Sequence, residues 1–360
     1  MGLESLALRD FRLFEAFELR PDPSAVTVLL SANGTGKTTV LEAVYALATA
    51  SSFRTNQAVD MIRNGTDVAE VHGVVRSNVR RVQVDLTLTR SGARVIKRML
   101  VNGQRPGSRA DLAESLPVTV FTPEGVDMVR HGPEGRRAFF TTLLTDVDLR
   151  TGELVERFER TLRQRNALLR SLRGERPSPT VHEELAAWTS DFVVVSQELV
   201  GARERLVARA GPLVEDRYRS LAESDVAVEV RYERSYAGEL AEALATSADD
   251  DRIRGYTTVG PHRDDVAVIL DGRDARRQAS QGEQRSLALA LRLAGHELVR
   301  SEREVSPLLL LDDVFSELDP MRSERLLSLL PEGQTLVTTA SPLPNAMEPA
   351  VVVTLPERTR

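Results

Sequence analysis

The stretch S-A-N-G-T-G-K-T-T at residues 31–39 limits the possible folds of this chain more than any other segment. A short aliphatic run at 26–30 precedes it, and apolar residues at helical spacing follow it at 40–47. In a turn from strand to helix, closely spaced glycines let successive backbone N–H groups point at a phosphate, and the positive end of the helix adds to the attraction. The pattern therefore predicts a phosphate-binding loop on an α/β fold.

The residue types in this loop predict ATP as the ligand. Lys37 would contact the β- and γ-phosphates and take part in catalysis, and the Thr38 hydroxyl would bind Mg²⁺. A plain glycine turn is the alternative, but the chain has only two lysines among its 47 basic residues, and Lys37 is one of them. Ser31 replaces the glycine with which this pattern usually begins, so its effect on the loop stays open. The predicted ATP-binding residues are Ser31, Asn33, Gly34, Thr35, Gly36, Lys37, Thr38 and Thr39.

A second apolar strand, P-L-L-L-L-D-D at 307–313, ends in two carboxylates. Asp312 at its tip is predicted to hold Mg²⁺ together with Thr38, and Asp313 is predicted to activate the attacking water. Upstream, S-x-G-x-Q at 280–284 opens a helical segment, and S-E-L-D at 316–319 follows the strand. Phosphate loop, signature and carboxylate strand in this order predict an ATPase of the ABC type. A serine that only caps the helix is the alternative for Ser280.

Composition excludes several other classes of protein. The chain has no cysteine, so disulfides, thiolate metal sites and cysteine nucleophiles are ruled out. Its first residues lack the pattern of a signal peptide, and no apolar run has the length of a membrane span, so we expect a cytoplasmic protein without a membrane partner. The net charge is −6, so a nucleic acid would have to meet a local basic patch.

The order of the motifs predicts an α/β P-loop NTPase head with an inserted, mostly helical second lobe. Residues 1–115 and 255–360 are expected to form the head, and residues 116–254 the lobe. Alternating apolar residues at 70–89 predict an antiparallel sheet, and 152–172 and 180–221 are predicted helices. Trp188 is expected in the core. Residues 164–166 are expected on a polar helix face, and contact with DNA is the alternative.

Residues 76–109 form the most basic run, with nine arginines or lysines against one acid, Asp85. Two interpretations stay open, a DNA-binding surface and a solvated sheet face. The candidate DNA-binding residues are Arg76, Arg80, Arg81, Lys97 and Arg98.

Several longer motifs resemble one family. They are S-S-F-R-T at 51–55, L-R-Q-R-N-A-L-L at 162–169, G-P-H-R-D-D at 260–265, A-S-Q-G-E-Q-R-S-L-A-L-A-L-R-L-A at 279–294 and L-L-L-L-D-D-V-F-S-E-L-D at 308–319. Together they resemble the RecF family of recombination mediators, within the ABC and SMC class of ATPase heads. The resemblance runs from Leu6 to about Thr339.

The resemblance implies a slow, Mg²⁺-dependent ATPase of DNA replication, DNA repair and the SOS response. Such a protein would bind double-stranded DNA and gapped or single-strand junction DNA, and would help RecO and RecR to load RecA. In this class the signature of one subunit closes on the nucleotide of another, which implies an ATP-dependent homodimer. The residues concerned are Ser280, Gln281, Gly282 and Gln284 of the signature and Asp319 of the D-loop.

Other functions stay open at this point. One is an SMC-like or other ABC-type ATPase acting on DNA, although an SMC protein would need hundreds of heptad residues. Another is a DNA-binding module with an impaired nucleotide site, for which Ser31 is the argument. A transporter subunit would need a switch histidine where this chain has T-T-A at 338–340.

Overall fold

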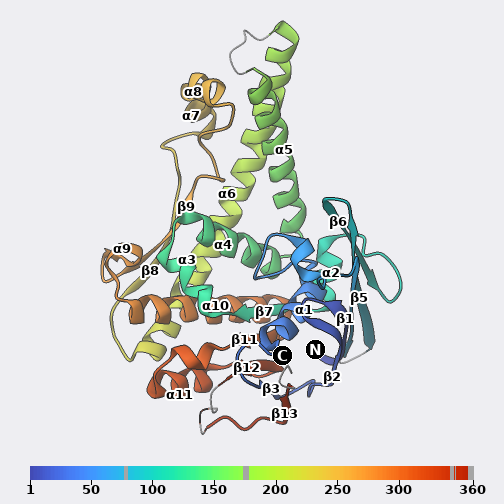
Figure 1. Ribbon diagram of the computed structural model, residues 1–360. Coiled ribbons are helices and arrows are strands. Elements are labelled where there is room, and N and C mark those ends of the chain that lie inside the picture. The colour runs from blue at the N-terminus through green and yellow to red at the C-terminus, as the bar shows by residue number, and fades with distance from the viewer. Residues whose placement is uncertain (77–79, 173–177, 341–343, 345, 356–360) are drawn as a thin grey trace. The chain divides into compact units, whose positions relative to one another are not determined.

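The computed structural model describes residues 1–76, 80–172, 178–340, 344 and 346–355. Two compact units make up the chain (Figure 1). The head unit comprises Met1–Gly125, Ser220–Ala222 and Arg292–Arg360. The lobe unit comprises Val126–Arg219 and Glu223–Leu291.

A five-stranded parallel sheet carries the predicted phosphate loop in the head unit. Its order is β13-β3-β12-β11-β7, and all neighbouring strands are parallel. β11 and β12 are buried along their whole length, as apolar strands in the middle of a parallel sheet are expected to be. The strands are β3 (Val26–Leu30), β7 (Val118–Phe121), β11 (Leu308–Asp312), β12 (Thr335–Thr339) and β13 (Val351–Thr354).

A second, antiparallel sheet of the head unit has the order β2-β1-β4-β5-β6. Residues that face its core alternate with outward-facing ones, as Val82, Val84 and Leu86 do in β5. The predicted antiparallel pairing within 70–89 is confirmed. The strands are β1 (Gly2–Phe11), β2 (Phe14–Leu19), β4 (Val68–Arg76), β5 (Arg81–Ser91) and β6 (Arg94–Val101).

Helix α1 (Lys37–Thr49) contacts both sheets of the head unit. Ten of its 13 residues are buried, because the helix is apolar on nearly every side and has a sheet on each of two faces. The shorter elements of this unit are η1 (Ala58–Met61), α2 (Arg109–Ser115), η3 (Val314–Glu317) and α11 (Pro320–Leu329). The short helix η2 (Pro123–Val126) crosses from the head unit into the lobe unit.

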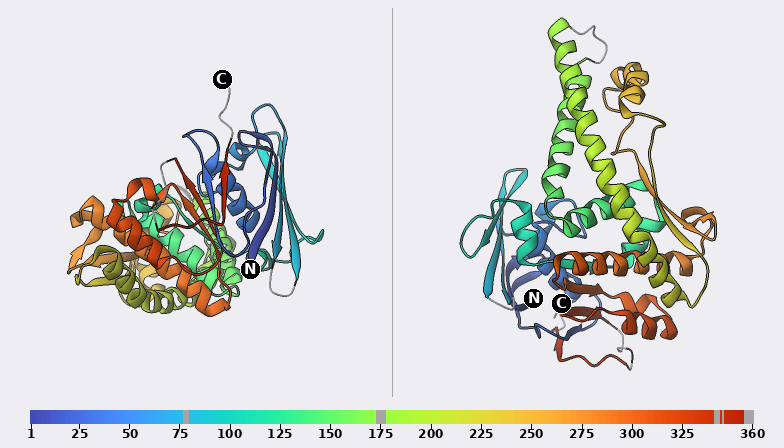
Figure 2. Two further views of the ribbon diagram at one scale, coloured as in Figure 1. Left: turned by 90° about the horizontal axis from the view of Figure 1, so that it is seen from below. Right: turned by 180° about the vertical axis from the view of Figure 1, so that it is seen from behind.

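The lobe unit is mostly helical, as predicted. Its longest helices are α5 (Thr151–Ser171) and α6 (Pro179–Ala222), which lie side by side in Figures 1 and 2. The last three residues of α6 are counted with the head unit. The other helices are α3 (Asp127–Arg130), α4 (Pro133–Val147), α7 (Leu240–Thr246), α8 (Ala248–Arg254), α9 (Ala275–Gln278) and the first part of α10 (Gln281–Arg303). A small antiparallel sheet of order β10-β9-β8 joins β8 (Val228–Glu233), β9 (Asp265–Leu270) and β10 (Arg273–Asp274).

The expected domain boundaries differ from these units. Residue 116 does not begin the lobe, because β7 pairs with β11 and so belongs to the head sheet. Residue 254 does not end the lobe, because β9 pairs with β8 and draws the chain as far as Leu291 into the lobe unit. The amino-acid composition around residues 116 and 254 does not indicate which strands the neighbouring β7 and β9 pair with.

Two expectations about side chains are also corrected. Trp188 is only half-buried, and Phe192, one turn further along α6, is fully buried instead. Arg165, expected on a polar helix face, is buried and bonded within the lobe unit. In the described parts of the chain, every helix is too short or too polar to span a bilayer.

Candidate nucleotide site

The loop at residues 31–36 has the backbone that the sequence predicts for phosphate binding. Gly34 and Gly36 have φ angles of 83° and 110°, in the left-handed region that disfavours other residues. A Cβ atom at Gly36 would also lie 2.7 Å from a ring carbon of Phe14. Glycine at position 36 is therefore required both by the turn and by the packing beneath it.

Lys37 is buried at the first turn of α1, with its ammonium group turned back onto the loop. Nζ donates to the carbonyl oxygens of Ser31 at 2.6 Å and Ala32 at 2.8 Å, and to Asn33 Oδ1 at 3.5 Å. Burial lowers the pKa of Lys37, and the nearby carboxylates of Asp313 and Asp312 oppose that shift. The ammonium group is therefore held by three acceptors of its own loop and feels the negative charge of two carboxylates.

Ser31 has a role that glycine could not have. Its Oγ donates to the carbonyl oxygen of Leu355 at 3.1 Å, just after β13, and its N–H donates to the carbonyl oxygen of Thr339 at 3.3 Å. The start of the loop is thereby fixed to two neighbouring strand ends. The loop that follows still has the predicted glycine conformations, so the serine does not disturb its geometry.

Asp312 and Thr38, the predicted metal pair, lie in direct contact. Asp312 is buried at the end of β11, and its Oδ1 accepts from Thr38 Oγ1 at 2.8 Å and from Thr338 Oγ1 at 2.7 Å. Among the described residues, no three His, Asp or Glu side chains gather as a metal cage. Mg²⁺ in a nucleotide site needs no such cage, because phosphates and water supply most of its oxygen ligands. One carboxylate beside one hydroxyl therefore fits the ion.

Asp313 follows directly and has unusual surroundings. Its φ angle of 48° is left-handed, which is uncommon for a residue with a side chain. Its Oδ1 is buried and has no hydrogen-bond partner among the described residues. A buried carboxylate oxygen without a donor costs free energy unless something else satisfies it. The predicted catalytic base thus has a buried acceptor atom that no described residue satisfies.

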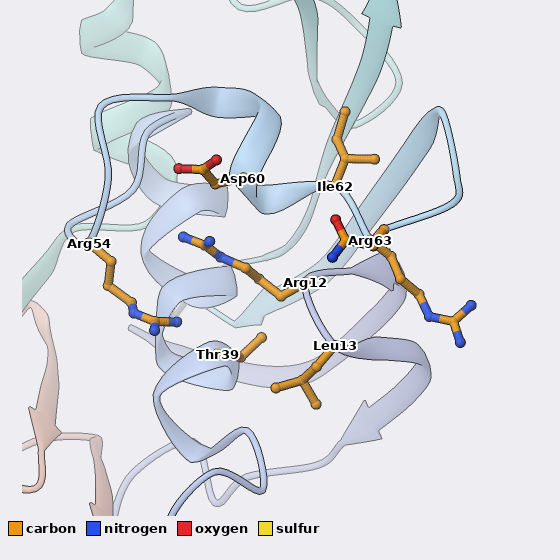
Figure 3. Close-up of a pocket in the computed structure, with 8 residues that line it drawn as sticks. Arg12, Leu13, Thr39, Arg54, Asp60, Ile62 and Arg63 are labelled. Carbon is orange, nitrogen blue, oxygen red and sulfur yellow. The ribbon is translucent and has the colours of Figure 1, made fainter.

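The sequence analysis did not predict an ion cluster around Glu42 of α1. Glu42 is fully buried and accepts from Arg12 Nε at 2.9 Å, Arg54 Nη1 at 3.2 Å and Ser52 Oγ at 2.5 Å. Figure 3 shows Arg12 and Arg54 extending across α1, whereas Arg63 points away from it. They line a cavity of about 660 Å³ with Leu13, Thr39, Asp60, Ile62, Arg63 and Asn64. The sequence feature that could have predicted this cluster is Glu42, an acid in the otherwise apolar run at 40–47.

Comparison with known proteins assigns these features to a family. The family model described as RecF/RecN/SMC N terminal domain matches residues 2–355. The DNA replication and repair protein RecF of Acidothermus cellulolyticus is 36% identical over 355 residues, which cover 95% of this chain and 94% of that protein. The protein of the same name from Geobacter sulfurreducens is 37% identical, with 92% and 90% covered.

This chain belongs to the RecF family.

Solved structures agree with this assignment at the level of the fold. One solved structure, described as the recombination mediator protein RecF-ATP in RecFOR pathway, matches this chain with a TM-score of 0.88 at 24% identity. The match covers 98% of this chain and 95% of that chain. The Smc head domain from Pyrococcus furiosus matches with a TM-score of 0.54 at 14% identity, covering 94% and 90%. The predicted α/β fold of an ABC-type ATPase head with a helical lobe is confirmed.

The signature of this RecF-family chain, Ser280 to Gln284, belongs to the lobe unit. Ser280 caps α10, because its Oγ accepts from the Glu283 N–H at 3.3 Å while Glu283 Oε2 accepts from the Ser280 N–H at 2.6 Å. Gln284 is buried and donates to the carbonyl oxygens of Ala275 and Arg276. Gln281 and Gly282 complete the first turn beside them. Ser280 therefore caps the helix, and its contact with the nucleotide of a second subunit stays a prediction.

Asp319, the predicted D-loop residue, lies in the head unit. It caps α11, with Oδ1 accepting from the Arg322 N–H at 2.9 Å. Its coupling of two nucleotide sites is likewise still a prediction.

The five candidate DNA-binding residues do not share one surface. Arg76 and Arg81 face outward at the paired ends of β4 and β5, and both contact Glu4, at 3.5 and 2.7 Å. Lys97 lies on the opposite, core-facing side of β6, where Nζ donates to the carbonyl oxygen of Ala50 at 2.7 Å, at the end of α1. Arg98, one residue on, faces outward, and Arg80 is exposed just before β5. Successive side chains of a strand point to opposite faces of the sheet, so the basic residues of 76–109 do not all lie on one face.

The G-P-H-R-D-D loop at 260–265 is held inside the lobe unit by buried polar contacts. Arg136 forms a bidentate pair with Asp265 at 2.9 and 2.7 Å, and Arg203 donates to the carbonyl oxygen of Pro261 at 2.8 Å. His262 Nε2 lies 2.9 Å from the carbonyl oxygen of Thr257, and burial lowers the pKa of His262. These contacts give this family motif a role in fixing the loop.

Proposed function

We propose that this RecF-family protein hydrolyses ATP slowly with Mg²⁺ and uses the nucleotide to control its binding to DNA in replication and repair. The observation that carries the proposal is the meeting of Lys37, Asp312 and Asp313 at one edge of the parallel sheet. The negative charges of Asp313 and Asp312 favour the charged form of Lys37 and oppose the effect of its burial, and Asp313 Oδ1 has no hydrogen-bond partner among the described residues. Such an arrangement is what phosphoryl transfer to water needs.

Each group has a definite part in this reaction. Lys37 and the loop N–H groups would bind and orient the phosphates, and Thr38 and Asp312 would hold Mg²⁺. The bound ion would neutralise charge on the phosphate oxygens. Asp313 would take the proton from the attacking water. Aspartate is one methylene shorter than the glutamate that is common at this position, so its poorer reach accounts for a low rate.

Binding of double-stranded DNA and of gapped or single-strand junction DNA is part of the same proposal. Relatives named DNA replication and repair protein RecF support it, and RecO, RecR and RecA are the proposed partners. The chain is acidic overall, so its DNA contacts must be local. Arg76, Arg81 and Arg98 on the outward face of the antiparallel sheet, with Arg80 just before β5, are the better candidates. Lys97 is instead engaged at the end of α1.

An ATP-dependent homodimer would complete the nucleotide site. Ser280 and the N–H groups near Gly282 would contact the γ-phosphate held by the other subunit, which ADP lacks. Light scattering of an Asp313→Asn variant should therefore show a dimer in ATP and a monomer in ADP. Adding Ser280→Arg should abolish the dimer. A monomer in ATP, or a dimer unaffected by Ser280→Arg, would contradict this arrangement.

ATP turnover measured with and without duplex DNA tests the proposal as a whole. We expect slow, Mg²⁺-dependent turnover that changes when duplex DNA is added. DNA binding without any turnover would instead favour a DNA-binding module with an impaired nucleotide site. Turnover that ignores DNA at saturating concentrations would favour an ABC-type ATPase of another kind.

A further inference from the structure

Thr338 contacts both carboxylate residues of the nucleotide site. It lies one residue before the end of β12, is buried, and is paired in the sheet with Asp312 of β11. Its Oγ1 donates to Asp312 Oδ1 at 2.7 Å and accepts from the Asp313 N–H at 3.0 Å. A hydroxyl group can do both because it has one donor and two acceptor positions. One side chain therefore connects the predicted metal ligand to the predicted base.

The backbone of Asp313 depends on the same residue. Its left-handed conformation is unfavourable for a residue with a side chain, so neighbouring contacts must hold it in place. The Asp313 N–H donates to two oxygens of Thr338, the carbonyl at 3.1 Å and Oγ1 at 3.0 Å. Without the hydroxyl, the Asp313 N–H would keep the hydrogen bond to the Thr338 carbonyl, while the Asp313 carbonyl still accepts from the N–H and hydroxyl of Ser316 at 3.3 and 2.8 Å.

The hydroxyl of Thr338 binds the backbone of Asp313 and not its carboxylate. Asp313 Oδ1 has no hydrogen-bond partner among the described residues. The donated hydrogen bond goes to Asp312, whose predicted task is to bind a cation and which needs no proton.

We propose that Thr338 is a positioning residue for ATP hydrolysis. Its hydroxyl group fixes the Asp312 carboxylate and the Asp313 backbone relative to each other. This inference rests on the proposed ATPase function. It gives a role to the position that has no switch histidine, and a threonine or serine hydroxyl is what the role requires.

The test compares Thr338→Val with Thr338→Ser in the full chain. Valine keeps the branched shape and loses the hydroxyl, so kcat should fall roughly 10- to 100-fold, the value of a hydrogen bond to a charged group. Binding of a non-hydrolysable ATP analogue should change by less than about threefold, because the phosphate loop is untouched. Serine keeps the hydroxyl and should retain kcat within about threefold of the parent. Thr335→Val, at the buried other end of β12, is the matched control and should also retain the parent kcat.

The outcomes separate this inference from the function on which it rests. A parent without turnover, or an unaffected Lys37→Ala variant, would overturn both. If the parent turns over ATP and Lys37→Ala does not, a parental kcat in Thr338→Val overturns the role of Thr338 alone. An equal loss in Thr338→Ser and Thr338→Val also overturns it, because the hydroxyl would then not matter. If Thr338→Val fails to fold, Thr338→Ala against Thr338→Ser makes the same comparison of the hydroxyl.

Discussion

Two buried polar clusters of this protein differ in how completely they are satisfied. In the lobe unit, Asp251 Oδ2 accepts from Arg165 at 2.9 Å, and its Oδ1 accepts from the N–H and hydroxyl of Thr258 at 2.8 and 2.6 Å. In the head unit, Asp313 Oδ1 is buried without a partner among the described residues. Both clusters contain a buried basic side chain and a buried aspartate oxygen, yet only the second leaves an acceptor open.

The difference indicates what each cluster is for. A fully satisfied cluster needs nothing from outside, so the Asp251 cluster acts in holding the segment after α8 to α5. An open acceptor beside a lysine and a second carboxylate is complete only with a ligand or water. Removing a group should therefore affect mainly folding in the first cluster and mainly chemistry in the second.

The largest effect is expected from Lys37→Ala. Loss of the ammonium group should reduce ATP turnover by roughly 100- to 1,000-fold, as removal of a preorganised charge partner in an active site does. The free energy of unfolding should change little, since the group bonds mostly to its own loop. Steady-state phosphate release and urea unfolding on the same preparation measure both. Normal ATP turnover in this variant would contradict the claim that the cluster of the head unit acts in ATP hydrolysis.

Asp251→Ala should have the largest effect on stability. It leaves Arg165, whose side chain is 3% exposed, buried without its charge partner. The expected loss is about 3–5 kcal/mol of unfolding free energy. The control is Asp249→Ala, two residues away, which removes only an exposed pair with Arg252 and should cost about 1 kcal/mol or less. Equal losses in the two variants, measured by urea unfolding, would show that the buried pair is not the anchor.

Exposed arginines outside both clusters are expected to affect DNA binding and not folding or ATP hydrolysis. Changing Arg80, Arg81 and Arg98 to glutamate should weaken binding to all duplex sequences alike. The slope of log K against log salt should fall by about one for each phosphate that an arginine no longer neutralises.

A control with the same change in net charge replaces Arg231, Arg234 and Arg252, which are ion-paired on the surface of the lobe unit. Its salt slope should stay near that of the parent. If both triple variants lose affinity equally, the effect is one of net charge and the basic run is an ordinary solvated face.

The smallest effect is expected from Lys97→Ala. The two lysines of the chain lie at opposite ends of α1, Lys37 at its first residue and Lys97 bonded to Ala50 beyond its last. Removing Lys97 takes a positive charge from the helix C-terminus, which should cost about 0.3–1 kcal/mol of stability. ATP turnover without DNA should stay near the parent value. A loss of turnover as large as that of Lys37→Ala would contradict the distinction between the two lysines.

The closeness of the candidate nucleotide-site residues was predictable because they belong to local motifs that a regular sheet brings together. Parallel strands end at the same edge, and β12 lies between β3 and β11. A loop that follows β3 and a carboxylate at the tip of β11 must therefore come close together. No further information was needed to place Lys37, Thr38, Asp312 and Asp313.

The remaining contacts were not predictable, because their partners are far apart in the chain and leave no pattern in it. Arg12 and Glu42 are 30 residues apart, and Arg165 and Asp251 are 86 apart. The division of the basic run between two sides of the sheet was not predictable for another reason. Successive residues of a strand face opposite sides, so a count along the sequence cannot say whether Lys97 and Arg98 share a surface.

Hydrolysis by the Asp313→Asn variant tests the central claim most directly. Asparagine has nearly the same shape and tolerates the left-handed backbone, so the fold and the binding of ATP should be retained. It cannot take a proton from water, so single-turnover cleavage of bound ATP should fall by roughly 100-fold or more. Binding and cleavage are measured on one preparation with saturating Mg²⁺ and with the protein in excess over ATP. ATP bound normally and barely cleaved is the predicted result, whereas cleavage at the parent rate would show that the open carboxylate of Asp313 is not the base.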